Sequence, residues 1–158
     1  MQIEWFAAHV LPAAFALLPS RLDSPEARAL VAAICLQESG LKYRRQVGGP
    51  ARGLAQFEIS GCKEVIGGHA TYDVAKSVLG ALLYADASDL DAHVALEHND
   101  VLAVAFARLL LWADRERLPP EHDAEAGWGY YLRRWRPGKP RHEAWAGNWD
   151  AAWSAVDP

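Results

Sequence analysis

The sequence predicts an all-α fold, and three observations support this prediction. Apolar residues recur at helical spacing along most of the chain, as at positions 27, 30, 31 and 34. Ser and Asn residues precede these runs and Gly and Pro residues follow them, as is typical of helix ends. No stretch shows the strict alternation of apolar and polar residues that marks a half-buried strand. With 158 residues, a single domain over 1–158 is the expected organisation.

The clearest helix is expected between Ser24, as its N-cap, and Gly40. A shorter apolar run, 10–18, precedes it and is interrupted by Pro12. A long Gly-rich loop is expected after it, from about Tyr43 to His69, and loops of this length are often functional. Further helices are expected over 73–84, 88–98, 101–112, 124–135 and the Trp-rich stretch that follows the Pro-Gly break at 136–140.

The segment 101–112 is apolar on almost all sides, which is typical of a helix at the centre of a domain. We therefore expect the other helices to pack around it. In the last helix, Trp145, Trp149 and Trp153 share one face and are expected in the core. Trp128 and Trp135, beside the Pro-Gly break, are better candidates for a sugar-binding groove.

Composition and charge argue against several classes of function. A net charge of −4 disfavours a dedicated nucleic-acid binder, which normally carries a basic excess. The run 10–18 is too short to span a bilayer, and no basic residue precedes it, so neither a membrane span nor a signal peptide is expected. The histidines show no metal-ligand spacing, so no metal and no cofactor are expected. Cys35 and Cys62 are expected as two reduced thiols, with a single bridge as the alternative.

Glu38 is the leading candidate for chemistry. It continues the apolar stripe of the helix expected between Ser24 and Gly40. Because it lies between Ile34 and Leu41 on that stripe, its carboxyl is expected to point toward the buried side in the last turn. Burial and the negative end of the helix dipole both disfavour the ionised form and raise its pKa. A carboxyl group that stays protonated near neutral pH is what a general acid for glycoside cleavage requires. The alternative is a solvated carboxylate, or one paired with Arg44, Arg45 or Arg52.

Two short segments support the first interpretation. Gln-Glu-Ser-Gly at 37–40 and Gly-Leu-Ala-Gln at 53–56 resemble the paired signature of soluble lytic transglycosylases and goose-type lysozymes, at a similar interval. The resemblance implies a lysozyme-like helical domain that cleaves the β-1,4 bond of peptidoglycan without a cofactor. It implies that Glu38 is the catalytic acid and base, that Ser39 supports it, and that Gln56 lies in the sugar groove.

The family's third segment, Ala-Tyr-Asn on a later helix, is matched best by Ala-Phe-Ala at 105–107, which lacks the hydroxyl and the amide. Phe106 is therefore expected along the groove wall, with Tyr130 or Tyr131 as the source of a hydroxyl. Glu58 is the leading candidate for a second carboxylate. If Glu38 acts alone, it protonates the glycosidic oxygen and then removes the C6 hydroxyl proton, giving a 1,6-anhydro sugar. A second carboxylate that holds a water would allow hydrolysis.

Longer stretches (44–53, 56–58, 106–112 and 131–140) resemble short proteins of tailed bacteriophages and prophages. This resemblance implies a chain made in the bacterial cytoplasm, with a virion location and other virion proteins as partners among the options. The alternative function is a phage structural or glycan-binding protein that keeps the fold without catalysis. A nucleic-acid-binding module is the least favoured function. It would depend on a local basic cluster, which is more simply interpreted as a solvent-exposed face: Arg133, Arg134, Arg136, Lys139 and Arg141.

Overall fold

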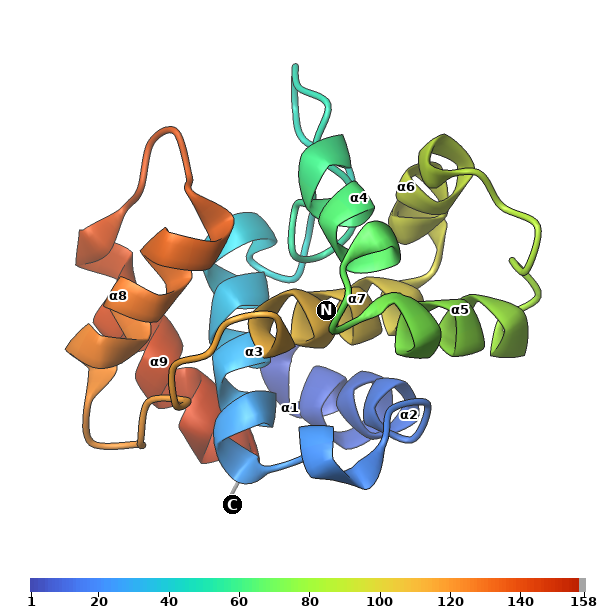
Figure 1. The fold of residues 1–158 in the computed structure, drawn as a ribbon. Coiled ribbons are helices and arrows are strands. Elements are labelled where there is room, and N and C mark those ends of the chain that lie inside the picture. The colour runs from blue at the N-terminus through green and yellow to red at the C-terminus, as the bar shows by residue number, and fades with distance from the viewer. Residues whose placement is uncertain (157–158) are drawn as a thin grey trace.

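The computed structural model describes residues 1–156 and confirms the all-α prediction (Figure 1). Within this range the only extended pairing consists of isolated bridges, Arg45 opposite Arg52 and Arg52 opposite Phe57. The helical elements are α1 (Ile3–Trp5), a π-helical turn (Phe6–Val10), α2 (Leu11–Phe15), a 3₁₀ turn (Ser20–Leu22), α3 (Pro25–Ser39), α4 (Ile59–Gly67), α5 (Tyr72–Ala81), α6 (Asp89–His98), α7 (Asp100–Trp112), α8 (Ala124–Trp135) and α9 (His142–Val156).

Helix α3 has the ends that its sequence predicts. The Ser24 hydroxyl accepts a hydrogen bond from the Ala27 N–H at 3.2 Å, and Pro25 occupies the first turn, where its missing N–H is not needed. At the other end Gly40 adopts a left-handed conformation with φ of 60°. The last turn of α3 contains no basic residue, so Glu38 sits beside the negative end of the helix without a cation in the same turn.

Two expectations about the first half of the chain are wrong. The first helix is not interrupted at Pro12, because the π-helical turn before it shifts the bonding: the Leu11 N–H donates to the Phe6 carbonyl. The loop expected over 43–69 contains α4 in its second half. Cys62 and Val65 form the buried side of α4 at helical spacing, a pattern that the surrounding glycines obscure in the sequence.

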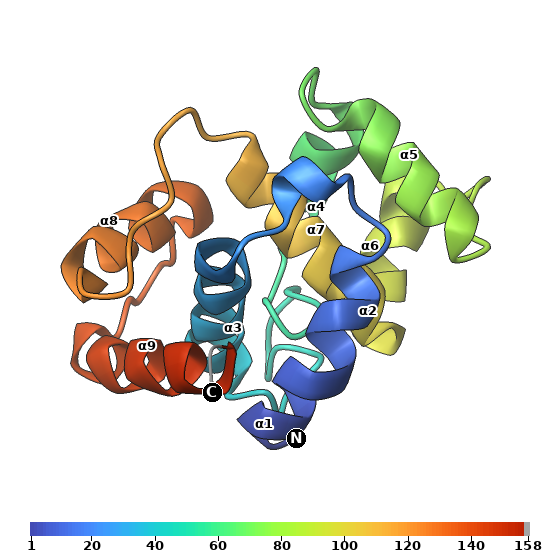
Figure 2. The same ribbon diagram turned by 90° about the horizontal axis from the view of Figure 1, so that it is seen from below.

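Helix α7 is buried along most of its length. Its residues from Leu102 to Leu111 are all buried, and it contacts α2, α3, α4, α5 and α6. Asn99 caps its start, since its side chain accepts a hydrogen bond from the Leu102 N–H at 3.0 Å. Figures 1 and 2 show α7 on one side of α3, together with α4 to α6, while α8 and α9 lie on the other side.

The pair α8 and α9 is joined by an aromatic layer. Trp145, Trp149 and Trp153 are buried, as their spacing predicts, and successive rings in this row lie 5.8 and 6.0 Å apart. Gly127 of α8 allows the close approach, because a Cβ at this position would lie 2.5 Å from the Trp149 ring. Since α9 also packs along α3, this layer fixes α8 relative to the end of α3 that carries Glu38.

Both cysteines are free thiols, as expected, and both are buried. Burial raises the pKa of both, that of Cys62 to about 12. Among the helices of residues 1–156, none combines the length and the apolar character needed to cross a membrane.

Candidate active site

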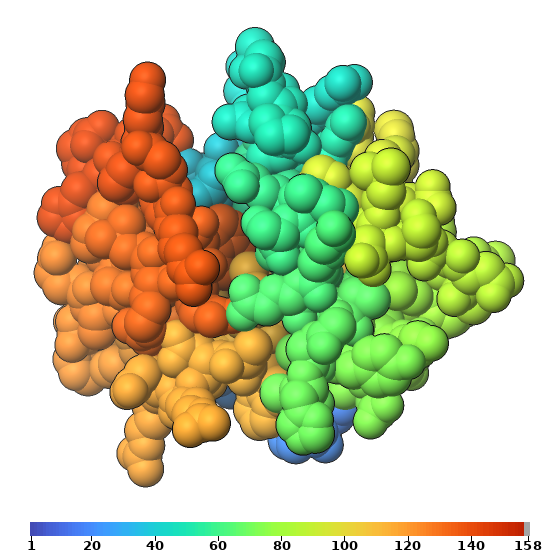
Figure 3. Space-filling model, turned by 45° about the horizontal axis from the view of Figure 1, so that its top comes forward, coloured from blue at the N-terminus to red at the C-terminus, as the bar shows by residue number. Residues whose placement is uncertain are grey.

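A cleft of about 760 Å³ separates two parts of the molecule. Figure 3 shows it as a groove between the orange surface of α8 with the segment after it and the green surface of α4. One wall comes from α4 and the loop before it, the other from α8 and residues 136–141. Gln37 and Glu38 at the end of α3 also line it. The structure therefore places the Glu38 side chain in an open cleft, between segments that are distant in sequence.

The Glu38 carboxyl is partly buried and has a defined partner. The Tyr131 hydroxyl donates a hydrogen bond to Glu38 Oε1 at 2.5 Å. Burial raises the pKa of Glu38, whereas this hydrogen bond and the positive charge of Arg141 lower it, and the net result is a raised pKa. The direction agrees with the one expected from burial at a helix end. In the described residues Oε2 accepts no hydrogen bond from the protein, which leaves it for a substrate oxygen.

Of the three arginines proposed as alternative partners of Glu38, two are engaged elsewhere, and none pairs with Glu38. Arg44 makes a two-pronged pair with Asp100, at 2.7 and 2.6 Å, and Arg52 pairs with Glu97. No Lys or Arg of residues 1–156 forms an ion pair with Glu38. The carboxyl is thus not neutralised by a salt bridge, and burial is the dominant influence on its pKa.

Tyr131 is held in place by its ring. It stacks on Trp145, with centroids 5.3 Å apart and planes 16° from parallel, and packs against Trp128 at 5.2 Å. Burial and the nearby Glu38 raise the pKa of Tyr131 far above its ordinary value, so the hydroxyl keeps its proton and acts as a donor. The aromatic layer of α8 and α9 therefore supplies a fixed hydroxyl to the Glu38 carboxyl.

The segment 53–56 forms a tight turn that brings Gln56 into the same cleft as Glu38. The backbone N–H and the side-chain amide of Gln56 both donate to the Gly53 carbonyl, at 3.0 and 2.8 Å. Gln56 has a φ of 48°, which is uncommon for a residue with a side chain and often marks a functional position. Its side chain lines the cleft, where Oε1 is available as an acceptor for a sugar hydroxyl or amide.

The turn is attached firmly to the helices behind it. Gly53 has a φ of 74°, and a Cβ there would lie 2.8 Å from the Leu96 carbonyl, so only glycine fits this approach to α6. His93 Nε2 donates to the Phe57 carbonyl at 2.7 Å. Within the turn, the Ala55 carbonyl accepts a hydrogen bond from Trp135 Nε1 at 2.8 Å, which links α8 to this turn. The walls are therefore connected at the base of the cleft.

Gln37 connects α3 to the segment before α9. Its side-chain amide donates to the Arg141 carbonyl at 2.9 Å, and its side-chain oxygen accepts from Asn148 at 2.8 Å. Arg141 Nη2 in turn donates to the Gln37 carbonyl at 2.7 Å. This partly buried polar network holds the Arg141 charge near Glu38, where it lowers the pKa of the carboxyl.

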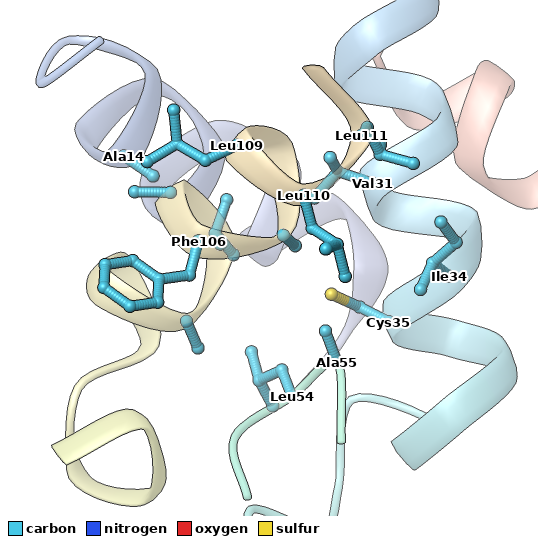
Figure 4. Packing of buried hydrophobic residues seen from close by; sticks show 14 of the residues in the cluster. Ala14, Val31, Ile34, Cys35, Leu54, Ala55, Phe106, Leu109, Leu110 and Leu111 are labelled. Carbon is cyan, nitrogen blue, oxygen red and sulfur yellow. The ribbon is translucent and has the colours of Figure 1, made fainter. Parts of the chain in front are cut away.

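Three predicted substrate-binding residues lie elsewhere. Ser39 is buried and its hydroxyl donates to the Cys35 carbonyl at 3.0 Å, one helical turn back, so it supports the helix rather than a ligand. Phe106 is fully buried, and Figure 4 shows it among the core residues. Tyr130 donates to the Leu111 carbonyl at 3.0 Å. It does not line the cleft that Tyr131 enters, because consecutive residues of a helix point about 100° apart.

The cleft lining includes two residues that the sequence predicts there and one that it does not predict. Glu58 lines the cleft as expected for a second carboxylate, and so does Trp135. Glu64, which α4 carries into the cleft, was missed because α4 was taken for a loop; it pairs with Arg134. Trp128 is absent from the lining and packs on Tyr131. Within residues 1–156 no group of acidic, His and Cys side chains is arranged to hold a metal ion.

Comparisons with protein-family models, with curated proteins and with solved structures found no match.

Proposed function

We propose that this protein cleaves the β-1,4 glycosidic bond of peptidoglycan, with Glu38 as the general acid. One observation carries the proposal: the Glu38 carboxyl, with a raised pKa and a Tyr131 hydroxyl on one oxygen, lies in an open cleft. Glycoside cleavage needs a protonated carboxyl beside the leaving oxygen, and burial without a salt bridge favours the protonated form of Glu38. The paired motif at 37–40 and 53–56 gives the proposal its substrate class.

In the proposed reaction, Glu38 donates its proton to the glycosidic oxygen as the bond from this oxygen to C1 breaks. The Tyr131 hydroxyl stabilises the carboxylate that forms, because it donates to Oε1 at 2.5 Å. The carboxylate then accepts the proton of the C6 hydroxyl. At the same time the C6 oxygen bonds to C1, which closes a 1,6-anhydro ring. Alternatively, a water held by Glu58 gives one proton to the Glu58 carboxylate as its oxygen bonds to C1, and the product has an ordinary reducing end.

A digest of purified peptidoglycan tests the proposal. The wild-type protein should release soluble muropeptides, and mass spectrometry of their ends distinguishes anhydro-forming cleavage from hydrolysis. If Glu58 holds a water, Glu58→Gln should lower the yield of reducing ends. If the sugar hydroxyl attacks, anhydro ends should dominate and Glu58→Gln should leave them unchanged. A wild-type digest that releases no muropeptide would reject the proposed activity.

The second candidate is a glycan-binding or structural phage protein without catalysis. The observation that favours it is the apolar segment 105–107, which is fully buried and offers no polar group to the cleft. In this case chitooligosaccharides or peptidoglycan would bind in the cleft and remain intact. Binding without cleavage by the wild-type protein would support this candidate over the enzyme.

A further inference from the structure

The wall of the cleft formed by α8 and the residues after it is strongly cationic. The stretch 133–141 contains five Arg or Lys residues and no acidic residue, in a chain with a net charge of −4. Arg133 points away from the cleft and pairs with Asp114 at 2.8 Å. The other four line the cleft: Arg134, Arg136, Lys139 and Arg141.

Two of these four cations have protein partners and two do not. Arg134 pairs with Glu64 and also donates to the Leu110 carbonyl at 3.1 Å. Arg141 donates to the Gln37 carbonyl at 2.7 Å. Within the described residues, the exposed side chains of Arg136 and Lys139 form no hydrogen bond and no ion pair. Their charges are therefore available to a ligand in the cleft.

The backbone that carries these two side chains is constrained. Arg136 adopts a φ of 48° at the end of α8, and its N–H donates to the Leu132 carbonyl at 3.0 Å. Pro137 and Pro140 restrict the path that follows. Trp135 on one side is attached to the Ala55 carbonyl. A constrained segment presents its charges at a lower cost in entropy than a flexible one.

We propose that Arg136 and Lys139 bind a carboxylate of the substrate, so that the cleft prefers anionic glycans to neutral ones. Peptidoglycan carries a lactyl or peptide carboxylate on alternate sugars, whereas chitin-type oligosaccharides carry none. Arg136 has the planar fork that pairs with a carboxylate, and Lys139 adds a compact charge beside it. This inference rests on the proposed function and deepens it, because it names the charge that selects the substrate.

Binding to the Glu38→Gln protein, measured by calorimetry, tests this inference without turnover. The two ligands are a peptide-free tetrasaccharide of alternating N-acetylglucosamine and N-acetylmuramic acid, and the neutral chitin tetrasaccharide of the same length. At low salt the charged ligand should bind roughly threefold to tenfold more tightly, and high salt should remove the difference. Adding Arg136→Gln and Lys139→Gln should abolish the preference. Arg115→Gln with Arg117→Gln, which removes two exposed cations outside the cleft, should retain it.

The inference is overturned if both ligands bind equally, if neither binds, or if the preference survives the loss of Arg136 and Lys139. It is also overturned if a short single-stranded DNA binds more tightly than the charged glycan and displaces it. A wild-type protein that cleaves peptidoglycan but shows no charge preference refutes this inference alone. A charge preference without cleavage refutes the proposed enzymatic activity alone.

Discussion

Replacing Tyr131 with Phe should raise the pKa of Glu38 further. The change removes the hydroxyl that donates to Glu38 Oε1 at 2.5 Å, and it keeps the ring that packs on Trp145 and Trp128. Because this hydrogen bond favours the carboxylate, its loss favours the protonated form. A hydrogen bond to a charged group contributes about 1.5–3 kcal/mol. Taking the lower end, since Glu38 is only partly buried, the acid dissociation constant of Glu38 should fall roughly tenfold.

Carbon-13 NMR titration of the Glu38 carboxyl measures this change directly. Tyr130→Phe is the matched control, because it removes a hydroxyl from the adjacent residue whose hydrogen bond goes to the Leu111 carbonyl. The control should leave the Glu38 titration unchanged. In the proposed enzyme, Tyr131→Phe should also move the high-pH limb of the rate profile to higher pH, because the protonated acid persists longer. An unchanged or lowered pKa in Tyr131→Phe would refute the role given to this hydroxyl.

Three further outcomes are expected. Gly53→Ala should lower the free energy of unfolding, measured in urea, by about 2 kcal/mol or more, because it combines a left-handed backbone with a backbone clash. Gly147→Ala, in open space on α9, should raise it by up to about 1 kcal/mol. Equal effects of the two substitutions would contradict this. Cys35 and Cys62 should both resist a thiol reagent in the folded protein and both react after unfolding; rapid labelling of the native protein would contradict their burial. Because burial raises the pKa of Glu38, ionising this carboxyl costs the folded protein stability as pH rises through that pKa. The free energy of unfolding of Glu38→Gln in urea, relative to wild type, should therefore grow from pH 4 to pH 8. A constant difference would contradict this.

The parts of the fold that the sequence predicts are those with strong local signals. The ends of α3 follow from Ser24, Pro25 and Gly40, since capping depends on residues adjacent in the chain. Helix α4 was missed because Gly61 and Gly67 are typical of loops, and its helical conformation depends on packing Cys62 and Val65 against other elements. Tertiary packing outweighs local propensity in such short helices.

The site was predicted in the same uneven way. The orientation of Glu38 follows from its place in an apolar stripe of one helix, which is a local property. The choice between Tyr130 and Tyr131 does not, because it depends on how α8 rotates against α3 through the Trp145 layer. Phe106 was misplaced for a related reason: on a helix that is apolar on almost all sides, no local signal separates a core side chain from one on the cleft wall.

The central claim is that the Glu38 carboxyl delivers the proton that breaks the glycan. The most direct measurement is the rate at which Glu38→Gln releases soluble muropeptides from peptidoglycan, compared with wild type under the same conditions. Gln keeps the shape and can still accept the Tyr131 hydrogen bond, but it cannot deliver a proton, and a positioned acid typically contributes about 10²–10⁴-fold to the rate. The account predicts a loss of this size in a variant that remains folded. Release by Glu38→Gln at the wild-type rate would contradict it.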